Sequence, residues 1–153
     1  MSPDWKPDDS MLDPAGGHET KGVKRVRDAL RPHGHDIGQR VLTSRDSDMQ
    51  DILDRLSRTD GMPTGFQQWQ LPVGIGENRT VLAFLTEAAA GAVLPAHSHE
   101  ADLFRVVVAG SLEFNGVQLG TGDWMFIPKG TTYQYTAASN PGATTLHCYG
   151  PKI

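Results

Sequence analysis

The 153-residue sequence has a single cysteine, Cys148, and this scarcity excludes an internal disulfide framework and a zinc site built from cysteines. It contains no apolar run long enough to cross a bilayer. Basic residues do not predominate, because 14 Lys and Arg stand against 18 Asp and Glu for a net charge of −4. Such a surface has no electrostatic reason to bind nucleic acid or an anionic membrane.

The first nine residues are acidic and interrupted by Pro3 and Pro7, which is the reverse of a secretory signal. A lone cysteine also suits a reducing compartment. We therefore expect a cytoplasmic protein.

The chain divides by composition into two parts. Residues 1–40 carry four prolines and few large apolar side chains, so we expect a mobile N-terminal arm. Within it, residues 21–31 have apolar side chains at helical spacing among basic ones, which predicts a short solvated helix. Residues 41–153 have the length and apolar content of one folded domain.

A second helix is predicted over residues 46–58. Met49, Ile52 and Leu56 recur at three- and four-residue spacing, and Ser44 or Asp46 can cap the start of the helix. This helix is expected to pack its apolar stripe on the main body.

After residue 63 the pattern changes to short β-favouring runs separated by Gly, Pro and Asn turns. Asn115-Gly116 is the strongest turn signal, because a type I′ hairpin needs positive φ at both central residues. Many short strands favour an all-β sandwich or small barrel. The expected strands are 66–71, 80–86, 103–108, 112–114, 124–127, 133–136 and 144–149.

The clearest candidate site is His97-Ser98-His99. Residues two apart on a strand point to the same face, so the two imidazoles can converge on one metal ion or one substrate. A histidine pair on a polar strand face is also a common and inert feature, so the pair needs support from its surroundings.

That support comes from glycine and proline spacing. Gly91-x5-His97-x-His99, followed by Gly110 and then by Gly122-x5-Pro128-x-Gly130, resembles the paired motifs of the cupin family. The resemblance covers roughly residues 66–150. It implies a cupin-type jelly-roll β-barrel with a site inside, lined by alternate side chains.

Two positions depart from the cupin pattern. Leu103 stands where cupins have a metal-binding Glu, and Tyr133 stands where they have a third histidine. The resemblance implies a divalent transition metal (Fe, Ni, Mn or Zn), and His147 in the last strand is a candidate to complete a set with His97 and His99. Alternatively, His147 lies at an edge and bonds water, or a bulge turns Asp102 into the site.

Arg105 interrupts an otherwise apolar strand. If it faces inward with Leu103, its guanidinium can bind a carboxylate of the substrate; if it faces outward, it forms an ion pair at a subunit interface. Tyr133 and Tyr135 share a face by strand period and are expected at the mouth of the cavity, with Tyr133 as a proton donor.

Two functions follow. The first is a small cupin enzyme of lyase, isomerase or dioxygenase type that acts on a small organic molecule, with His97, His99 and Tyr133 as catalytic residues and Arg105 and Tyr135 contacting the substrate. The second is a non-catalytic module that binds or senses a small ligand without metal. In either case we expect a homodimer with a small-molecule ligand and no nucleic-acid or membrane partner.

Overall fold

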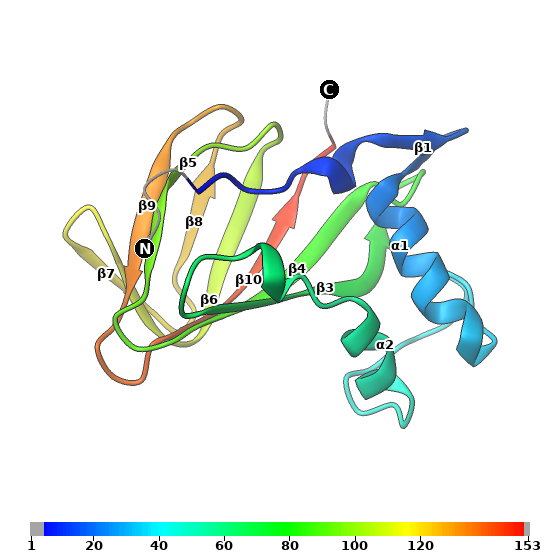
Figure 1. Cartoon of the computed structure of the whole chain (residues 1–153), viewed down its shortest axis with the longest axis horizontal. Coiled ribbons are helices and arrows are strands. Elements are labelled where there is room, and N and C mark those ends of the chain that lie inside the picture. The colour runs from blue at the N-terminus through cyan, green and yellow to red at the C-terminus, as the bar shows by residue number, and fades with distance from the viewer. Residues whose placement is uncertain (1–4, 152–153) are drawn as a thin grey trace.

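The computed structural model describes residues 5–151, which form an eight-stranded antiparallel sheet with two short helices at one end (Figure 1). The sheet curls on itself, and its strands follow the order β3-β4-β10-β6-β9-β5, with β7 and β8 also paired to β6. This is the all-β cupin jelly-roll that the sequence predicted. The elements are β1 Pro14–Gly16, β2 Glu19–Thr20, α1 Lys21–Leu30, α2 Met49–Arg55, β3 Phe66–Ile75, β4 Val81–Ala88, β5 Val93–His97, β6 Leu103–Phe114, β7 Val117–Gly120, β8 Trp124–Ile127, β9 Tyr133–Ala137 and β10 Ala143–Tyr149.

Alternation along the strands gives the sheet a concave inner face and an outer face. In β10 every second side chain from Ala143 to Tyr149 is buried, and the residues between them are half-buried. In β6 the same period buries Leu103, Arg105 and Val107. Because side chains two apart share a face, the inner face holds both apolar groups and buried polar groups such as Arg105.

β6 is one strand of twelve residues, whereas the sequence predicted two strands separated at Gly110. Gly110 has φ +70, and the β6–β10 register shifts between Thr144 and Thr145 next to it. A Cβ on Gly110 would overlap the carbonyl oxygen of Gly142. Glycine therefore lets the strand continue through a bulge instead of ending it. The predicted turn at Asn115-Gly116 is confirmed, with φ of +49 and +79.

Helix α1 begins where Thr20 caps it, since the Thr20 hydroxyl accepts a hydrogen bond from the Val23 N–H at 3.3 Å. Val23, Val26 and Leu30 are buried, and the Gln70 side-chain amide donates to the Gly22 carbonyl at 2.9 Å. The helix therefore packs against β3, and the expectation that it would be solvated was wrong because its apolar stripe faces the sheet. The mobility of residues 1–40 in solution stays a prediction.

Helix α2 is shorter than the predicted span of 46–58. The Asp46 carboxylate accepts hydrogen bonds from the Thr43 N–H at 3.2 Å and the Thr43 hydroxyl at 2.8 Å, which makes a turn before the helix. The helix begins only after this turn, and Met49 and Ile52 are buried as the spacing predicted.

Residues 5–13, called the N-terminal strap below, run across the open side of the curled sheet (Figure 1). Met11 and Leu12 are buried in the core, and the Trp5 indole N–H donates to the Gly61 carbonyl at 3.0 Å. Between residues 5 and 151 no helix has the length and apolar character needed to span a membrane.

Candidate functional site

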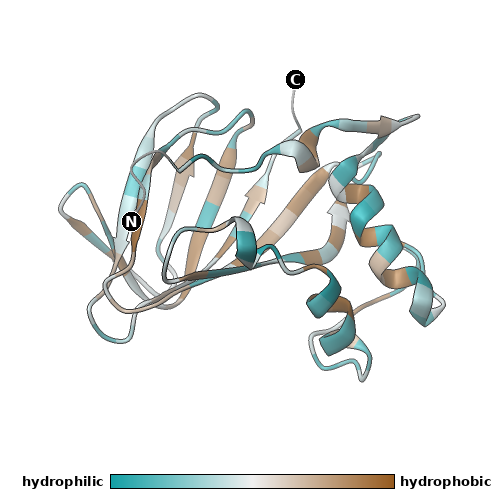
Figure 2. Cartoon of the chain, in the orientation of Figure 1, coloured by the Kyte–Doolittle hydropathy of each residue, from teal (hydrophilic) through white to brown (hydrophobic). Residues whose placement is uncertain are grey.

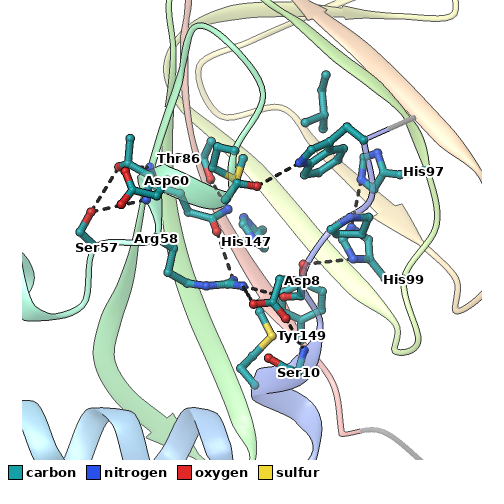
Figure 3. Close-up of a pocket in the computed structure, with 18 of the residues that line it drawn as sticks. Asp8, Ser10, Ser57, Arg58, Asp60, Thr86, His97, His99, His147 and Tyr149 are labelled. Atoms are coloured by element: carbon teal, nitrogen blue, oxygen red, sulfur yellow. Dashed lines mark hydrogen bonds and ion pairs between the residues drawn. The ribbon is translucent and has the colours of Figure 1, made fainter. Parts of the chain in front are cut away.

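A cavity of about 440 Å³ lies between the inner face of the sheet and the N-terminal strap. Its wall combines strap residues, the turn at 57–62 and inward side chains of the sheet. Figure 3 shows His97 and His99 on one side of the cavity and Arg58 on the other, with His147 between them. Figure 2 shows hydrophilic and hydrophobic segments alternating along the strands that line this region.

The two predicted histidines come together although only one of them lies on a strand. His97 ends β5, and His99 follows in the loop. Their Nε2 atoms are 3.1 Å apart, and both rings are buried. Nδ1 of His97 lies 2.7 Å from the Pro95 carbonyl, which can only accept, so this nitrogen carries the hydrogen of the neutral ring. Nε2 of His97 is then an acceptor toward His99.

Burial lowers the pKa of His97 to about 4. The hydrogen bond to the Pro95 carbonyl opposes this shift, while the neighbouring His99 and Arg105 strengthen it. His97 is therefore neutral at pH 7.

Sequence analysis missed the group that holds His99. Asp9 of the strap places a carboxylate oxygen 3.1 Å from Nδ1 of His99 and accepts the backbone N–H of Glu100 at 3.3 Å. Trp5 of the same strap packs edge-on to His97, with ring centroids 5.0 Å apart. The strap is ninety residues away in the sequence, so no local motif could have indicated its part in the site.

Arg105 lies on the inner face of β6 and is 4 % exposed. Its Nη1 donates to the Thr145 hydroxyl at 2.7 Å, its Nη2 donates to the Tyr133 hydroxyl at 3.2 Å, and the guanidinium lies 5.2 Å from the centre of the Tyr135 ring. Its Nε has no hydrogen-bond partner among residues 5–151. Among the described residues no carboxylate forms an ion pair with Arg105, so its buried positive charge meets only hydroxyl groups and an aromatic ring.

His147 is directly opposite Arg105 in the β10–β6 register. It is 1 % exposed and stacks on Phe84 with ring centroids 5.2 Å apart, and its Nδ1 has no hydrogen-bond partner in the described part of the chain. Burial, helped by the positive charge of Arg105, lowers its pKa well below the ordinary histidine value, so the ring is neutral. The structure places it in the cavity wall, which is one of the two positions that the sequence left open.

Three tyrosines surround these groups. Tyr133 and Tyr135 are buried on the inner face of β9, and Tyr149, which sequence analysis did not single out, places its hydroxyl 3.2 Å from Nδ1 of His99. Burial raises the pKa of both Tyr135 and Tyr149, so their hydroxyls stay protonated at neutral pH. They are hydrogen-bond donors, not anions.

A second cation, Arg58, also went unnoticed in the sequence. Its Nη2 donates to the Asp8 carbonyl at 2.6 Å and its Nη1 donates to the Gln68 side-chain oxygen at 3.2 Å, which ties the strap to β3. Its guanidinium lies 5.3 Å from the centre of the Phe84 ring. Asp102 does not turn inward, since its carboxylate accepts the Lys129 backbone N–H at 2.8 Å.

The residues of the site fit a resident metal poorly. Two imidazole nitrogens converge, but within residues 5–151 no group of three or more His, Cys, Asp or Glu side chains is placed to hold an ion. Catalytic zinc sites use three protein ligands. The buried charge of Arg105, which already lowers the pKa of His97 and His147, would also repel a divalent cation. We derive no chemical step through a metal.

Comparison with known proteins agrees with this architecture. A model of the ChrR cupin-like domain family matches residues 56–153. No curated protein matches the chain. Among solved structures, the complex of Rhodobacter sphaeroides SigE with the anti-sigma ChrR is similar at 23% identity and TM-score 0.53, over 61% of this chain and 49% of that one. KdgF from Halomonas sp. is similar at 24% identity and TM-score 0.50, over 60% of this chain and 83% of KdgF.

The alignment with the first of these structures thus spans about half the length of that chain, and both likenesses show the fold alone. The family match covers most of this chain, from the end of α2 through the whole main sheet. The chain belongs to the family of ChrR cupin-like domains.

Proposed function

We propose that the cavity binds a small organic carboxylate and that Arg105 receives the carboxylate group. The observation that carries this proposal is the unpaired charge of Arg105, which is 4 % exposed, has a free Nε and lines the cavity. A buried charge without an opposite charge costs several kcal/mol. An anionic ligand supplies the missing charge, and a guanidinium binds a carboxylate through two parallel hydrogen bonds.

His147 supports the same ligand. His147 and Arg105 are directly opposite in an antiparallel pair, where Cβ atoms lie about 5 Å apart. Within residues 5–151, Nδ1 of His147 and Nε of Arg105 both lack a hydrogen-bond partner. A neutral imidazole with its hydrogen on Nδ1 donates to a carboxylate oxygen. One bound anion would thus satisfy both atoms.

The size and polarity of the cavity limit the ligand. At about 440 Å³ the cavity takes a small molecule. Its wall includes Gln68, Thr86 and Arg58 besides Arg105, so the part of the ligand beyond the carboxylate meets hydrogen-bonding groups and a second cation. These groups favour a hydroxy, keto or second carboxylate group over an alkyl chain.

A thermal-unfolding screen tests this function. Small carboxylates, each matched with its neutral amide, are added to the protein, and we expect the unfolding temperature to rise with carboxylates only. Arg105→Gln should abolish the rise, whereas Arg45→Gln, at an exposed position away from the cavity, should preserve it. Equal shifts with acids and amides, or an undiminished shift in Arg105→Gln, would contradict the proposal.

Acid–base catalysis on the bound acid is the second candidate function, and the contact between His97 and His99 favours it. The 3.1 Å separation of the Nε2 atoms requires one hydrogen between them, and the Asp9 carboxylate lies 3.1 Å from Nδ1 of His99. When the Nε2–Nε2 contact opens, a freed ring nitrogen, with the Tyr133 hydroxyl nearby, can exchange a proton with a ligand held on Arg105, as lyase or isomerase chemistry needs. Following a binding carboxylate by NMR in the presence of the protein distinguishes turnover from binding.

Non-catalytic binding is the alternative, and the family favours it. The ChrR structure is that of an anti-sigma in complex with SigE, so a domain of this family can occur in a regulatory protein. In that case the carboxylate is a signal and stays unchanged in the NMR experiment.

Metal binding by His97, His99 and His147 stays a prediction, and the dioxygenase-type hypothesis depends on it. Elemental analysis of freshly purified protein tests it. Stoichiometric Fe, Ni, Mn or Zn that is lost in His97→Ala would favour the metalloenzyme over the carboxylate site described here.

A further inference from the structure

The cavity wall carries more positive than negative charge, and this excess is not confined to Arg105. Four basic side chains line the cavity against two acidic ones: Lys21, Arg25, Arg58 and Arg105, against Asp8 and Asp60. Lys21 and Asp60 are exposed, whereas Arg25 and Arg58 are half-buried. Arg25 and Arg58, called the arginine pair below, are therefore a second place in the wall where positive charge is partly withdrawn from water.

Arg25 donates hydrogen bonds to neutral oxygens. Its Nη1 lies 3.3 Å from the Leu56 carbonyl and 3.2 Å from the side-chain oxygen of Gln70. Its Nη2 donates to the Ser57 carbonyl at 2.7 Å. Within the described part of the chain no carboxylate forms an ion pair with Arg25. These bonds hold the side chain in place and leave its charge without an opposite charge.

Arg58 has a weak carboxylate partner. The Asp8 carboxylate lies 3.8 Å from its Nη2 and is 65 % exposed, so water screens this pair and it offsets little of the charge. Burial lowers the pKa of both arginines, and the positive charge of Arg58 lowers that of Arg25 further, with Asp8 opposing the shift. The two guanidiniums are thus close enough to repel each other, and an anion between them would relieve the repulsion.

Buried polar side chains connect the arginine pair to Arg105 across the inner face of the sheet. Gln68 of β3 is opposite Thr86 of β4, and Thr86 is opposite Thr145 of β10. Arg58 donates to the Gln68 side chain at 3.2 Å, and the Gln68 amide donates to the Thr86 hydroxyl at 3.1 Å. At the other end Arg105 donates to the Thr145 hydroxyl at 2.7 Å. The two cationic sites therefore lie at the two ends of one polar row.

The strand spacing gives the separation of these sites. The Arg58 guanidinium lies 5.3 Å from the centre of the Phe84 ring on β4, and Arg105 bonds Thr145 on the neighbouring strand β10. Neighbouring strands are about 4.8 Å apart, so the guanidiniums of Arg58 and Arg105 are about one to two spacings apart, roughly 5–10 Å. A short molecule with an anionic group at each end spans this distance, and a cavity of about 440 Å³ holds it.

We propose that the ligand of this cavity is a dianion, in the simplest case a dicarboxylate, with one carboxylate on Arg105 and the other on the arginine pair. This inference rests on the proposed function, because the Arg105 site is its first anchor. Within residues 5–151, hydrogen bonds use three of the five N–H groups of Arg25 and two of the five of Arg58. Both guanidiniums thus keep donors for a carboxylate.

Calorimetric titration with the linear dicarboxylates from malonate to suberate, each compared with its own monoamide, tests the second site. The monoamide has the same length and keeps one carboxylate for Arg105, so the ratio of the two dissociation constants reports the second anionic contact. We expect the diacid to bind about tenfold more tightly than the monoamide near adipate, because a hydrogen bond between two charged groups is stronger than one to an amide. The ratio should be smallest for malonate, which is too short to reach both sites.

Variants locate the second contact. Arg58→Gln and Arg25→Gln should each weaken binding of the diacid more than that of the monoamide, so that the ratio falls at least about threefold. Arg105→Gln should abolish binding of both compounds. Arg45→Gln is the matched control, since it removes one positive charge at an exposed position outside the cavity, and it should keep the ratio of the wild type.

Three results would overturn the proposal: monoamides that bind as tightly as their diacids, a ratio that does not vary with length, or a ratio that neither Arg58→Gln nor Arg25→Gln reduces. If one of these variants misfolds, the other variant and the wild-type series still decide. Monoamides that bind through Arg105 without any advantage for the diacid would leave the proposed function intact. Acids and monoamides that all fail to bind would remove the proposed function together with this inference.

Discussion

Arg105 and His147 are directly opposite each other on β6 and β10, and each has a buried nitrogen that lacks a hydrogen-bond partner within residues 5–151. The pair explains why a strand that is otherwise apolar contains an arginine. Nε of Arg105 and Nδ1 of His147 have no hydrogen-bond partner in the described part of the chain, and both residues lie in the wall of the cavity. The cavity is thus prepared for a ligand that accepts hydrogen bonds and carries negative charge.

Replacing Arg105 should separate stability from ligand binding. In Arg105→Met the free energy of unfolding without ligand should stay within about 1 kcal/mol of wild type or rise, because an uncompensated buried charge is removed. Urea unfolding measures it. A loss of about 3–5 kcal/mol, typical of breaking a buried ion pair, would show that Arg105 already has an internal partner.

Acid should destabilise the protein through His97. Its folded pKa of about 4 is below the unfolded value of 6.5, so the unfolded chain binds more protons between these two pH values. The stabilising contribution is present above pH 6.5 and is lost as pH falls toward 4. From pH 7 to pH 5 the loss should be about 2 kcal/mol.

Urea unfolding at pH 7 and pH 5 checks this expectation with two variants. His97→Gln should remove the His97 share of the pH dependence and leave the share of His147, whose pKa is also lowered by burial, while His18→Gln, at an exposed histidine, should leave the pH dependence as in wild type. The same slope in wild type and His97→Gln would show that other groups cause it.

The strap should loosen when Asp9 loses its charge. In Asp9→Asn the contacts to His99 and to the Glu100 N–H weaken, so amide hydrogen exchange over residues 5–13 should increase at least tenfold while exchange in β6 and β10 stays slow. Asp54→Asn removes an exposed carboxylate on α2 and serves as the control. Unchanged exchange in the strap would mean that Trp5 and Met11 hold it without the carboxylate.

Gly110 should tolerate no side chain. Gly110→Ala combines positive φ with an overlap between the new Cβ and the Gly142 carbonyl, whereas Gly116→Ala has positive φ and open space around it. The second substitution should cost about 1 kcal/mol and the first at least about 2 kcal/mol more, as measured by urea unfolding. Equal costs would show that Gly110 lies farther from the Gly142 carbonyl than it does in the structure.

The sequence predicted most of the sheet because local patterns determine it. The strand expected at residues 144–149 and the Asn115-Gly116 turn both correspond to what the structure shows. It predicted β6 as two strands because a glycine signals a break in sequence, and only the packing against Gly142 shows that this one allows a bulge. The strands predicted from the sequence did not include β5 or β7.

The site was predictable only where strand period and family motif coincide. His97 and His99 come from the motif, and Arg105 follows from its apolar neighbours. Asp9, Arg58 and Tyr149 meet these residues through the tertiary structure alone, and none of them has a sequence signal beyond its residue type. The lack of a charge partner for Arg105 is likewise visible only when all neighbours are placed.

The most direct test of the carboxylate site is a crystal structure of the protein with the acid that raises its unfolding temperature most. We expect a carboxylate oxygen at about 2.7–3.2 Å from Nε of Arg105, with the same group in contact with Nδ1 of His147. An acid that binds elsewhere, with both nitrogens still lacking a partner, would contradict the account.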